Sequence, residues 1–174
     1  MAQDTFFSSK KTLNIRGNAV SLEVPAVMGI VNITPDSFYQ GSRSQSEEHI
    51  LKVVESMVDD GAAFIDVGGY SSRPGAADIS AEEEIKRVVP AIQIIRKEFD
   101  NIYISCDTFR SNVAHEALEA GADMINDISG GELDPNMFEL IANKKVPYIL
   151  MHMKGTPQTM VEQAHYLDLI MELI

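Results

Sequence analysis

The sequence has a single cysteine, few basic residues and no long apolar run, and each shortage excludes a class of protein. Cys106 alone cannot form an intrachain disulfide, which fits a reducing compartment. Fourteen Lys and Arg residues stand against 26 Asp and Glu residues, and the formal net charge of −12 disfavours nonspecific binding to nucleic acid or to an anionic membrane. No apolar run approaches the ~18 residues of a membrane span, and Met1 to Lys11 lacks a secretory pattern. We therefore expect a cytoplasmic protein with no nucleic-acid or membrane partner.

What remains is enough apolar material for an ordinary folded domain. The chain has 174 residues, of which 45% are apolar, so it can bury a real core. After Lys11 the stretch TLNIRGNAVSLEVP alternates apolar and polar residues around Arg16, Gly17 and Asn18, which predicts a β-hairpin. We assign an N-terminal extension with this hairpin to residues 1–25 and a second, larger domain to residues 26–174.

From Pro25 onward, short apolar strands alternate with amphipathic helices. The strand-like runs are AVMGIVN, AAFIDV, IYISCD, DMINDI and VPYILMHM. Capping boxes at Ser44–Glu47 and Ser80–Glu83 predict helix starts. Pro90 lies within the second helical pattern and is expected to kink or break it. The expected helices begin at Ser44, Ser80, Arg110, Asp134 with Pro135, and Leu167; Gly61 and Gly121 end the first and third.

This alternation predicts an α/β fold with a parallel sheet of right-handed βαβ units. The stretches GAAFID from Gly61 and GADMIN from Gly121 align two units apart and place Asp66 and Asn126 in the same slot. Alternate strands of a barrel contribute to one layer, so these two side chains are expected at one height. We predict a (β/α)8 TIM barrel truncated after about five βα units, because eight strands typically need ~250 residues.

The structural alternative is a doubly wound open sheet of five strands. That fold would need no further strands. However, the nucleotide fingerprint expected after its first strand is absent, because GIVNITPDSF carries no glycine-rich phosphate loop.

Polar side chains end each expected strand, at the edge where barrel enzymes place their active sites. The first two loops add more specific features. ITPDSFYQGSRS is too long for a minimal turn, and GGYSSRPGAADIS combines glycines and hydroxyls with Arg73, which suits an anion clamp. A mobile solvated loop is the structural alternative. The strand-end residues are Asn32, Asp66, Asp107, Asn126 with Asp127, and His152.

Five segments together resemble a known enzyme family. GIVNITPDSF, DVGGYSSRPG, SCDTFRSNV, GADMINDISGG and ILMHMKGTPQTM are similar, in order and spacing, to the signature segments of dihydropteroate synthase. The resemblance runs from about Ala26 to Met160. It implies a transferase of folate biosynthesis that condenses a dihydropterin methyl pyrophosphate with p-aminobenzoate and releases pyrophosphate with Mg²⁺ bound. It also implies a homodimer at full length and competition by sulfonamides at the aminobenzoate slot.

The resemblance assigns pterin recognition to the strand ends. A pterin presents a guanidine-like edge of N–H donors, which a buried carboxylate and an amide can read. Asp107 and Asn126 take that role, with Asp66 nearby. Asp107 is also the main catalytic candidate, because a preorganised carboxylate stabilises positive charge on the pterin as pyrophosphate leaves. Asn32 matches the metal-linked asparagine of the family, which is compatible with Mg²⁺ that keeps several waters.

The loops are assigned the remaining roles. Asp36 and Arg73 are candidate catalytic residues that, with Ser72, organise the diphosphate and the metal. Phe38 and Pro74 resemble the wall of the aminobenzoate slot, and Met151 joins them as a substrate-binding residue. Two positions depart from the usual pattern, since Tyr70 and Ser72 stand where the family commonly has Glu and Thr.

The later aspartate, lysine and Arg-x-His segment of the family belong to strands six to eight, which this sequence does not contain. We therefore expect this portion alone to lack part of the pterin pocket and to be inactive. A pterin-binding methyltransferase domain is the alternative enzyme, although the TPDSF and RPG loops do not suit it. A non-catalytic fragment is the alternative from another class.

Overall fold

The structure is a computed structural model that describes residues 11–33, 43–71, 73 and 77–173, without the side chains of residues 43–45. Strands β1 (Thr12–Ile15) and β2 (Asn18–Ser21) pair in antiparallel register and form the predicted hairpin. A separate sheet has five strands. These are β3 (Val27–Asn32), β4 (Ala62–Gly68), β5 (Tyr103–Asp107), β6 (Met124–Asp127) and β7 (Tyr148–Leu150).

The order of the five-stranded sheet decides between the two predicted architectures. All four neighbouring pairs are parallel, and the strands follow the order β3-β4-β5-β6-β7, which is their order in the chain. A doubly wound sheet reverses its strand order at a switch point, whereas a barrel adds each new strand to the same side. The sequential order is that of five consecutive units of a β/α barrel, as predicted.

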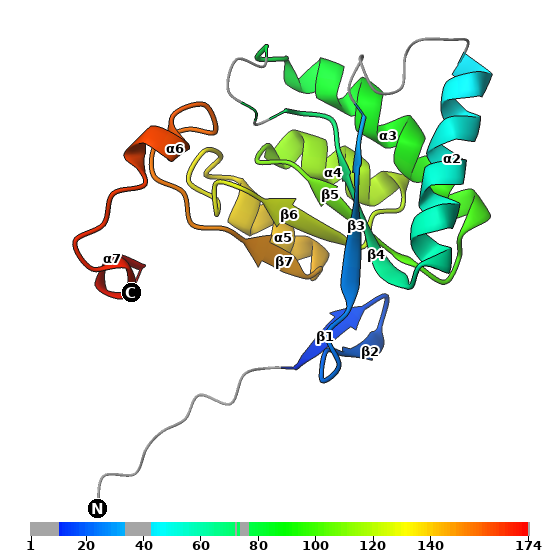
Figure 1. The fold of residues 1–174 in the computed structure, drawn as a ribbon, viewed down its shortest axis with the longest axis horizontal. Helices are drawn as coiled ribbons and strands as arrows, with labels where there is room; N and C mark the ends of the chain where they lie inside the picture. The colour runs from blue at the N-terminus through cyan, green and yellow to red at the C-terminus, as the bar shows by residue number, and fades with distance from the viewer. Residues whose placement is uncertain (1–10, 34–42, 72, 74–76, 174) are drawn as a thin grey trace, which may run out of the picture.

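The main helices lie on one face of this sheet (Figure 1). Their bounds correct several predictions. α2 begins at Arg43, one residue before the expected start at Ser44. α3 runs through Pro90 without a break, and α5 begins after Pro135. α6 was not expected, and α7 begins two residues after Leu167. The helices are α2 (Arg43–Asp59), α3 (Ala81–Glu98), α4 (Ser111–Ala120), α5 (Met137–Lys144), α6 (Met160–Gln163) and α7 (Leu169–Leu173).

Helix α3 shows why the predicted pattern folds locally as it does. Ser80 caps the helix by accepting a hydrogen bond of 3.2 Å from the Glu83 N–H, as predicted. Three glutamates lie in the first turn and Arg96 and Lys97 in the last, which suits the helix dipole. In the part of the chain that the structure describes, no helix combines the length and the hydropathy needed to span a bilayer.

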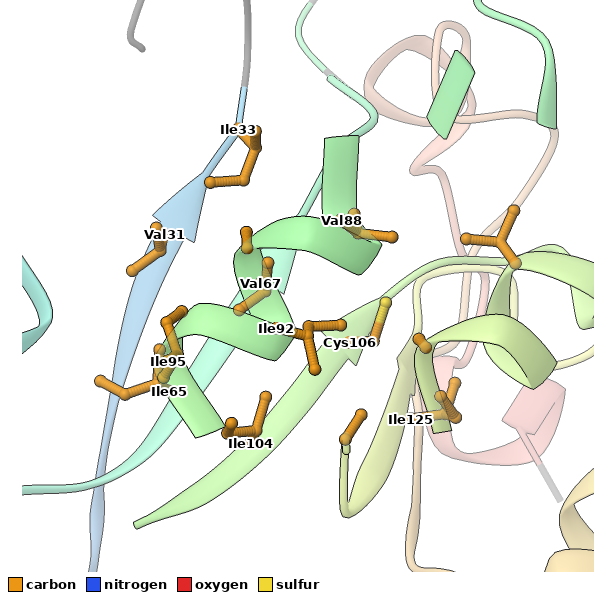
Figure 2. Packing of buried hydrophobic residues seen from close by; sticks show 14 of the residues in the cluster. Val31, Ile33, Ile65, Val67, Val88, Ile92, Ile95, Ile104, Cys106 and Ile125 are labelled. Atoms are coloured by element: carbon orange, nitrogen blue, oxygen red, sulfur yellow. The ribbon is translucent and has the colours of Figure 1, made fainter. Parts of the chain in front are cut away.

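The main core fills the space between the sheet and the helices. Figure 2 shows Val88, Ile92 and Ile95 of α3 packed toward the side chains of β3 to β6. All three are fully buried, and each such side chain contributes roughly 1.5–3 kcal/mol relative to an exposed position. Cys106 is buried in the same cluster, as expected from its place next to Asp107 on a strand.

A smaller core lies on the opposite face of the sheet, where the hairpin covers the N-terminal ends of the strands (Figure 1). Ile15 packs there with Phe64 and Met124. Next to it, the carboxylate of Asp123 receives hydrogen bonds from Arg16 Nε at 2.5 Å and from Arg96 Nη2 at 2.6 Å. This ion-pair cluster joins the hairpin to β6 and α3, and leaves the C-terminal strand ends open.

Candidate active site

The candidate site lies at the C-terminal ends of β3 to β6, on the face that points away from the helices. Side chains alternate between the two faces of a strand. Val31, Val67, Cys106 and Ile125 belong to the core against the helices, so their strand neighbours project to the other face. Those neighbours are Asn32, Asp66, Gly68, Asp107 and Asn126.

Asp66 and Asn126 meet across the inner face. Asn126 Nδ2 donates a hydrogen bond of 2.9 Å to Asp66 Oδ2, which confirms that the internal repeat places these side chains at one height. Asp66 is only 4% exposed, and its Oδ1, like Ser105 Oγ, is buried without a hydrogen-bond partner in the described part of the chain. Burial raises the pKa of Asp66, and the polar side chains of Ser105 and Asn126 reduce that rise.

Asp107 and Asn32 flank Gly68 on the same edge. A Cβ atom built on Gly68 would lie 3.5 Å from both Asn32 Oδ1 and Asp107 Oδ2. Burial, followed by the charges of Asp66, Glu84 and Asp127, raises the pKa of Asp107 to about 7. Glycine at position 68 therefore leaves room beside a partly protonated carboxyl group, on the open face of the sheet.

The raised pKa of Asp107 predicts a pH-dependent loss of stability. Because the pKa in the folded state lies above the unfolded value, the folded state favours the protonated form, and stability falls as pH rises through about 7. Between pH 5 and pH 8 the free energy of unfolding of the wild type should fall by about 2–3 kcal/mol more than that of Asp107→Asn, because one unit of pKa shift corresponds to ~1.4 kcal/mol. Urea denaturation at several pH values checks this, and parallel curves for the two proteins would contradict it.

Asp127 faces the other way and has a structural role. Its carboxylate accepts hydrogen bonds from the backbone N–H groups of Ser129 at 2.7 Å and Gly131 at 3.0 Å, and from the Tyr148 hydroxyl at 2.6 Å. Burial and the Asp127 carboxylate together raise the pKa of Tyr148. Asp127 thus holds the turn after β6, while its neighbour Asn126 contributes to the site.

Two other predicted site residues, Arg73 and Met151, lie in the described part of the chain. Arg73 is exposed, and its backbone N–H donates a hydrogen bond of 3.4 Å to Ser71 Oγ. Met151 follows β7 and is 39% exposed, with its backbone N–H bonded to the Asp127 carbonyl. The remaining four predictions concern residues outside those that the structure describes. They are Asp36, Phe38, Ser72 and Pro74.

Sequence reasoning missed a buried ion pair beside the site. Glu84 of α3 is fully buried and accepts a hydrogen bond from Arg110, which precedes α4. Glu84 lies four residues before Val88 and eight before Ile92, so a carboxylate on the apolar stripe was a usable signal. Arg110 also stacks against Phe109 and against Tyr70, the residue that departs from the family pattern.

The arrangement is rich in hydrogen-bond acceptors. Two carboxyl groups and one amide converge on the open face within a partly desolvated site, so they suit a planar ligand with an edge of N–H donors. The same carboxyl groups can stabilise positive charge that develops on such a ligand. Among the described residues, no group of three or more His, Cys, Asp or Glu side chains could hold a metal ion by itself.

Comparisons with known proteins agree with this geometry. The family model described as pterin binding enzyme matches residues 28–174. A dihydropteroate synthase from Synechocystis is 50% identical over 147 residues, covering 84% of this chain and 50% of that protein. A dihydropteroate synthase structure from Xanthomonas albilineans with 4-aminobenzoic acid superposes with a TM-score of 0.80 and 37% identity, covering 94% of this chain and 57% of that one. The Xanthomonas albilineans enzyme in complex with 7,8-dihydropteroate gives a TM-score of 0.76 at 33% identity, covering 93% and 55%.

In each comparison the match covers a larger share of this chain than of the relative. The match extends over most of this chain, but the chain spans about half the length of the curated relatives it matches. The strand ends that carry Asp66, Asp107 and Asn126 lie within the matched residues.

Proposed function

Because this chain belongs to the family of pterin-binding enzymes, we propose that it serves dihydropteroate synthesis in the folate pathway. In this reaction the amine of p-aminobenzoate attacks the methylene carbon of a dihydropterin methyl pyrophosphate. A C–N bond forms, the C–O bond to the diphosphate breaks, pyrophosphate leaves and the amine loses a proton. The structures of relatives with 4-aminobenzoic acid and with 7,8-dihydropteroate support this substrate and this product.

The observation that carries the proposal is the cluster of Asp66, Asp107 and Asn126 on one open face. The hydrogen bond between Asn126 and Asp66 fixes the amide, so the Asn126 carbonyl oxygen is free to accept from a ligand. The unpartnered Asp66 Oδ1 and the Asp107 carboxyl supply further acceptors for the donor edge of the pterin. Donors on a bound pterin would also lower the pKa of Asp107 and favour its charged form.

The same residues would act during the departure of pyrophosphate. Positive charge develops on the pterin methylene as the C–O bond weakens, and Asp107 in its charged form stabilises it across the partly buried site. Arg73, an exposed residue between β4 and α3, would donate hydrogen bonds to the diphosphate, since a guanidinium can bond two phosphate oxygens at once. Asp36, Ser72, Phe38 and Pro74 are proposed to complete the diphosphate and aminobenzoate sites.

We also propose that Asn32 contributes one ligand to Mg²⁺. Its exposed amide oxygen sits at the strand end beside Gly68 and Asp107, where the missing Cβ leaves space. Mg²⁺ keeps several waters and commonly binds through few protein oxygens together with substrate phosphates, so this sparse donor set fits. When bound, the ion would neutralise charge on the diphosphate.

Two finer proposals concern the protein as a whole. A cytoplasmic location is proposed because Cys106, the only cysteine of the sequence, is free and buried, which fits a reducing compartment. A homodimer at full length is proposed from the family. Light scattering after size-exclusion chromatography tests the second.

The decisive test is the reaction of the full-length protein that contains this chain. With Mg²⁺, dihydropterin methyl pyrophosphate and p-aminobenzoate, we expect dihydropteroate and stoichiometric pyrophosphate, and we expect sulfonamides to compete with p-aminobenzoate. Transfer of a methyl group from methyltetrahydrofolate, with no condensation of aminobenzoate, would overturn the proposal in favour of a pterin-binding methyltransferase.

A further inference from the structure

Arg110 lies where three parts of the molecule meet. Its side chain is only 18% exposed. Nη1 donates to the buried Glu84 carboxylate of α3. Nη2 donates to the Ile79 carbonyl oxygen at 2.8 Å and approaches Asp78 Oδ1 at 3.5 Å. The guanidinium therefore joins α3 and the segment before it to the turn after β5.

Aromatic contacts extend this junction to the other end of the same connection. The Arg110 guanidinium carbon lies 4.7 Å from the ring centre of Phe109 and 5.2 Å from that of Tyr70. The two rings contact each other edge to face, with centres 5.1 Å apart. A planar guanidinium can stack on aromatic faces while its N–H groups bond in the plane, which an ammonium cannot do. Arg110 thus contacts residues just after β4 and just before α3.

Two further contacts fix the start of this connection. Arg87 of α3 donates a hydrogen bond of 3.2 Å to the Gly69 carbonyl oxygen. A Cβ atom on Gly69 would approach Val88 Cγ1 to 2.9 Å, so only glycine allows the chain to pass this close to α3. The connection therefore leaves β4 along a defined path toward Tyr70 and returns along Asp78 and Ile79.

The position matters because Arg73 lies between these two anchored ends, while Asp107 lies three residues before Arg110. A small shift of the ends would displace Arg73 relative to Asp107. We propose that Arg110 is a positioning residue that holds both ends of the β4–α3 connection against the turn after β5, with Glu84 as its buried counter-ion. The consequence for diphosphate binding rests on the proposed function, whereas the anchoring itself does not.

The test must separate anchoring from simple neutralisation of Glu84. Removing Arg110 alone would leave a buried carboxylate without its cation, which unfolds many proteins. The informative protein is therefore the double variant Arg110→Met with Glu84→Gln, which leaves no buried charge unpaired, since Asp78 is 79% exposed. Arg96→Met with Asp123→Asn is the control for the loss of a buried ion pair at the other end of α3; it also takes the carboxylate from Arg16, and the correction for global unfolding accounts for that cost. Arg110→Lys is a second variant that keeps the charge but lacks the planar fork.

The rate of cleavage by chymotrypsin measures the anchoring directly, because Tyr70 must leave its contacts with Phe109 and Arg110 before the Tyr70–Ser71 bond can be cut. In the full-length protein we expect cleavage after Tyr70 to be about tenfold faster in the double variant than in wild type, as local opening becomes easier. Arg110→Lys should show an intermediate rate. Cleavage after the buried Phe64 reports global unfolding and corrects each rate for it. The control variant should show the wild-type rate after this correction.

Calorimetry then tests the consequence for ligands. At pH 8, where Asp107 is mostly charged with or without the Glu84 carboxylate, the double variant should bind the pterin pyrophosphate about tenfold more weakly, while its affinity for pteroate stays within about twofold of wild type. Wild-type protection of Tyr70 in the double variant would overturn the proposal and leave Arg110 as a counter-ion for Glu84. If wild type binds neither compound, the proposed function fails, and the cleavage rates alone decide whether Arg110 anchors the connection.

Discussion

Asp107→Asn is expected to weaken the binding of pteroate by at least about tenfold and to lower kcat as well. The substitution keeps the size of the side chain but replaces an acceptor-only carboxylate with an amide that presents donors to the donor edge of the pterin. Charge-assisted hydrogen bonds in such a site are worth roughly 1.5–3 kcal/mol each. Because Asp107 would also stabilise charge as pyrophosphate leaves, the transition state should lose more than the ground state.

Arg73→Ala provides the contrast for this prediction. Arg73 is exposed and would act through the diphosphate, so its loss should leave pteroate binding nearly unchanged while it weakens the pterin pyrophosphate. Calorimetry of the full-length enzyme with both compounds separates the two roles, and steady-state rates show the change in kcat. Equal effects of both substitutions on pteroate would show that the assignment of these residues is wrong.

The inner face of the site was predictable from the sequence because it follows strand periodicity. Asp66 and Asn126 occupy the same slot of two repeats that are two units apart, and parallel strands at that spacing do bring them into hydrogen-bond contact. The alternation of side chains along a strand also places Asp107 and the buried Cys106 on opposite faces of the sheet, which the sequence alone allows one to infer. These inferences needed only local geometry that each strand carries by itself.

Helix starts were less predictable because polar residues before a helix have several uses. Asp134 was expected to begin a helix, but its carboxylate accepts hydrogen bonds from the backbone N–H groups of Ser111 at 2.7 Å and Asn136 at 3.0 Å, and α5 begins later. Asn136 precedes the helix without a side-chain cap. An Asp that bonds the backbone two residues ahead forms a turn, and the sequence does not distinguish that turn from a cap.

The ion pairs were missed because each joins residues that are far apart in the sequence. Glu84 and Arg110 are separated by 26 positions, and a glutamate in the first turn of a helix is ordinarily solvated. The folded chain buries this carboxylate by bringing Gly69 and Arg110 against it. A carboxylate on the apolar stripe of an otherwise amphipathic helix is the one local signal of such a partner.

The other large effect is expected at the opposite end of the strands, at Asp123, which directly precedes β6. Its side chain is 3% exposed, and it accepts hydrogen bonds from Arg16, from Arg96 and from the Ile104 backbone N–H at 2.8 Å. Arg16 also donates to the carbonyl oxygens of Asp100 and Ile102. One carboxylate therefore balances two guanidinium groups and ties the hairpin to the sheet.

Asp123→Ala should lower the free energy of unfolding by about 3–5 kcal/mol, because breaking a buried pair leaves its partners without compensation. Arg96 is 19% exposed and cannot turn fully to water, whereas Arg16 is 40% exposed and can recover part of its hydration.

Glu48→Ala, which removes a surface pair with Lys52, is the control and should cost less than ~1 kcal/mol. Urea denaturation measures both. Asp123→Asn keeps one acceptor for the Ile104 N–H, so its free energy of unfolding should lie between those of wild type and Asp123→Ala. A loss of unfolding free energy in Asp123→Ala no larger than that in Glu48→Ala would show that Asp123 does not hold the hairpin.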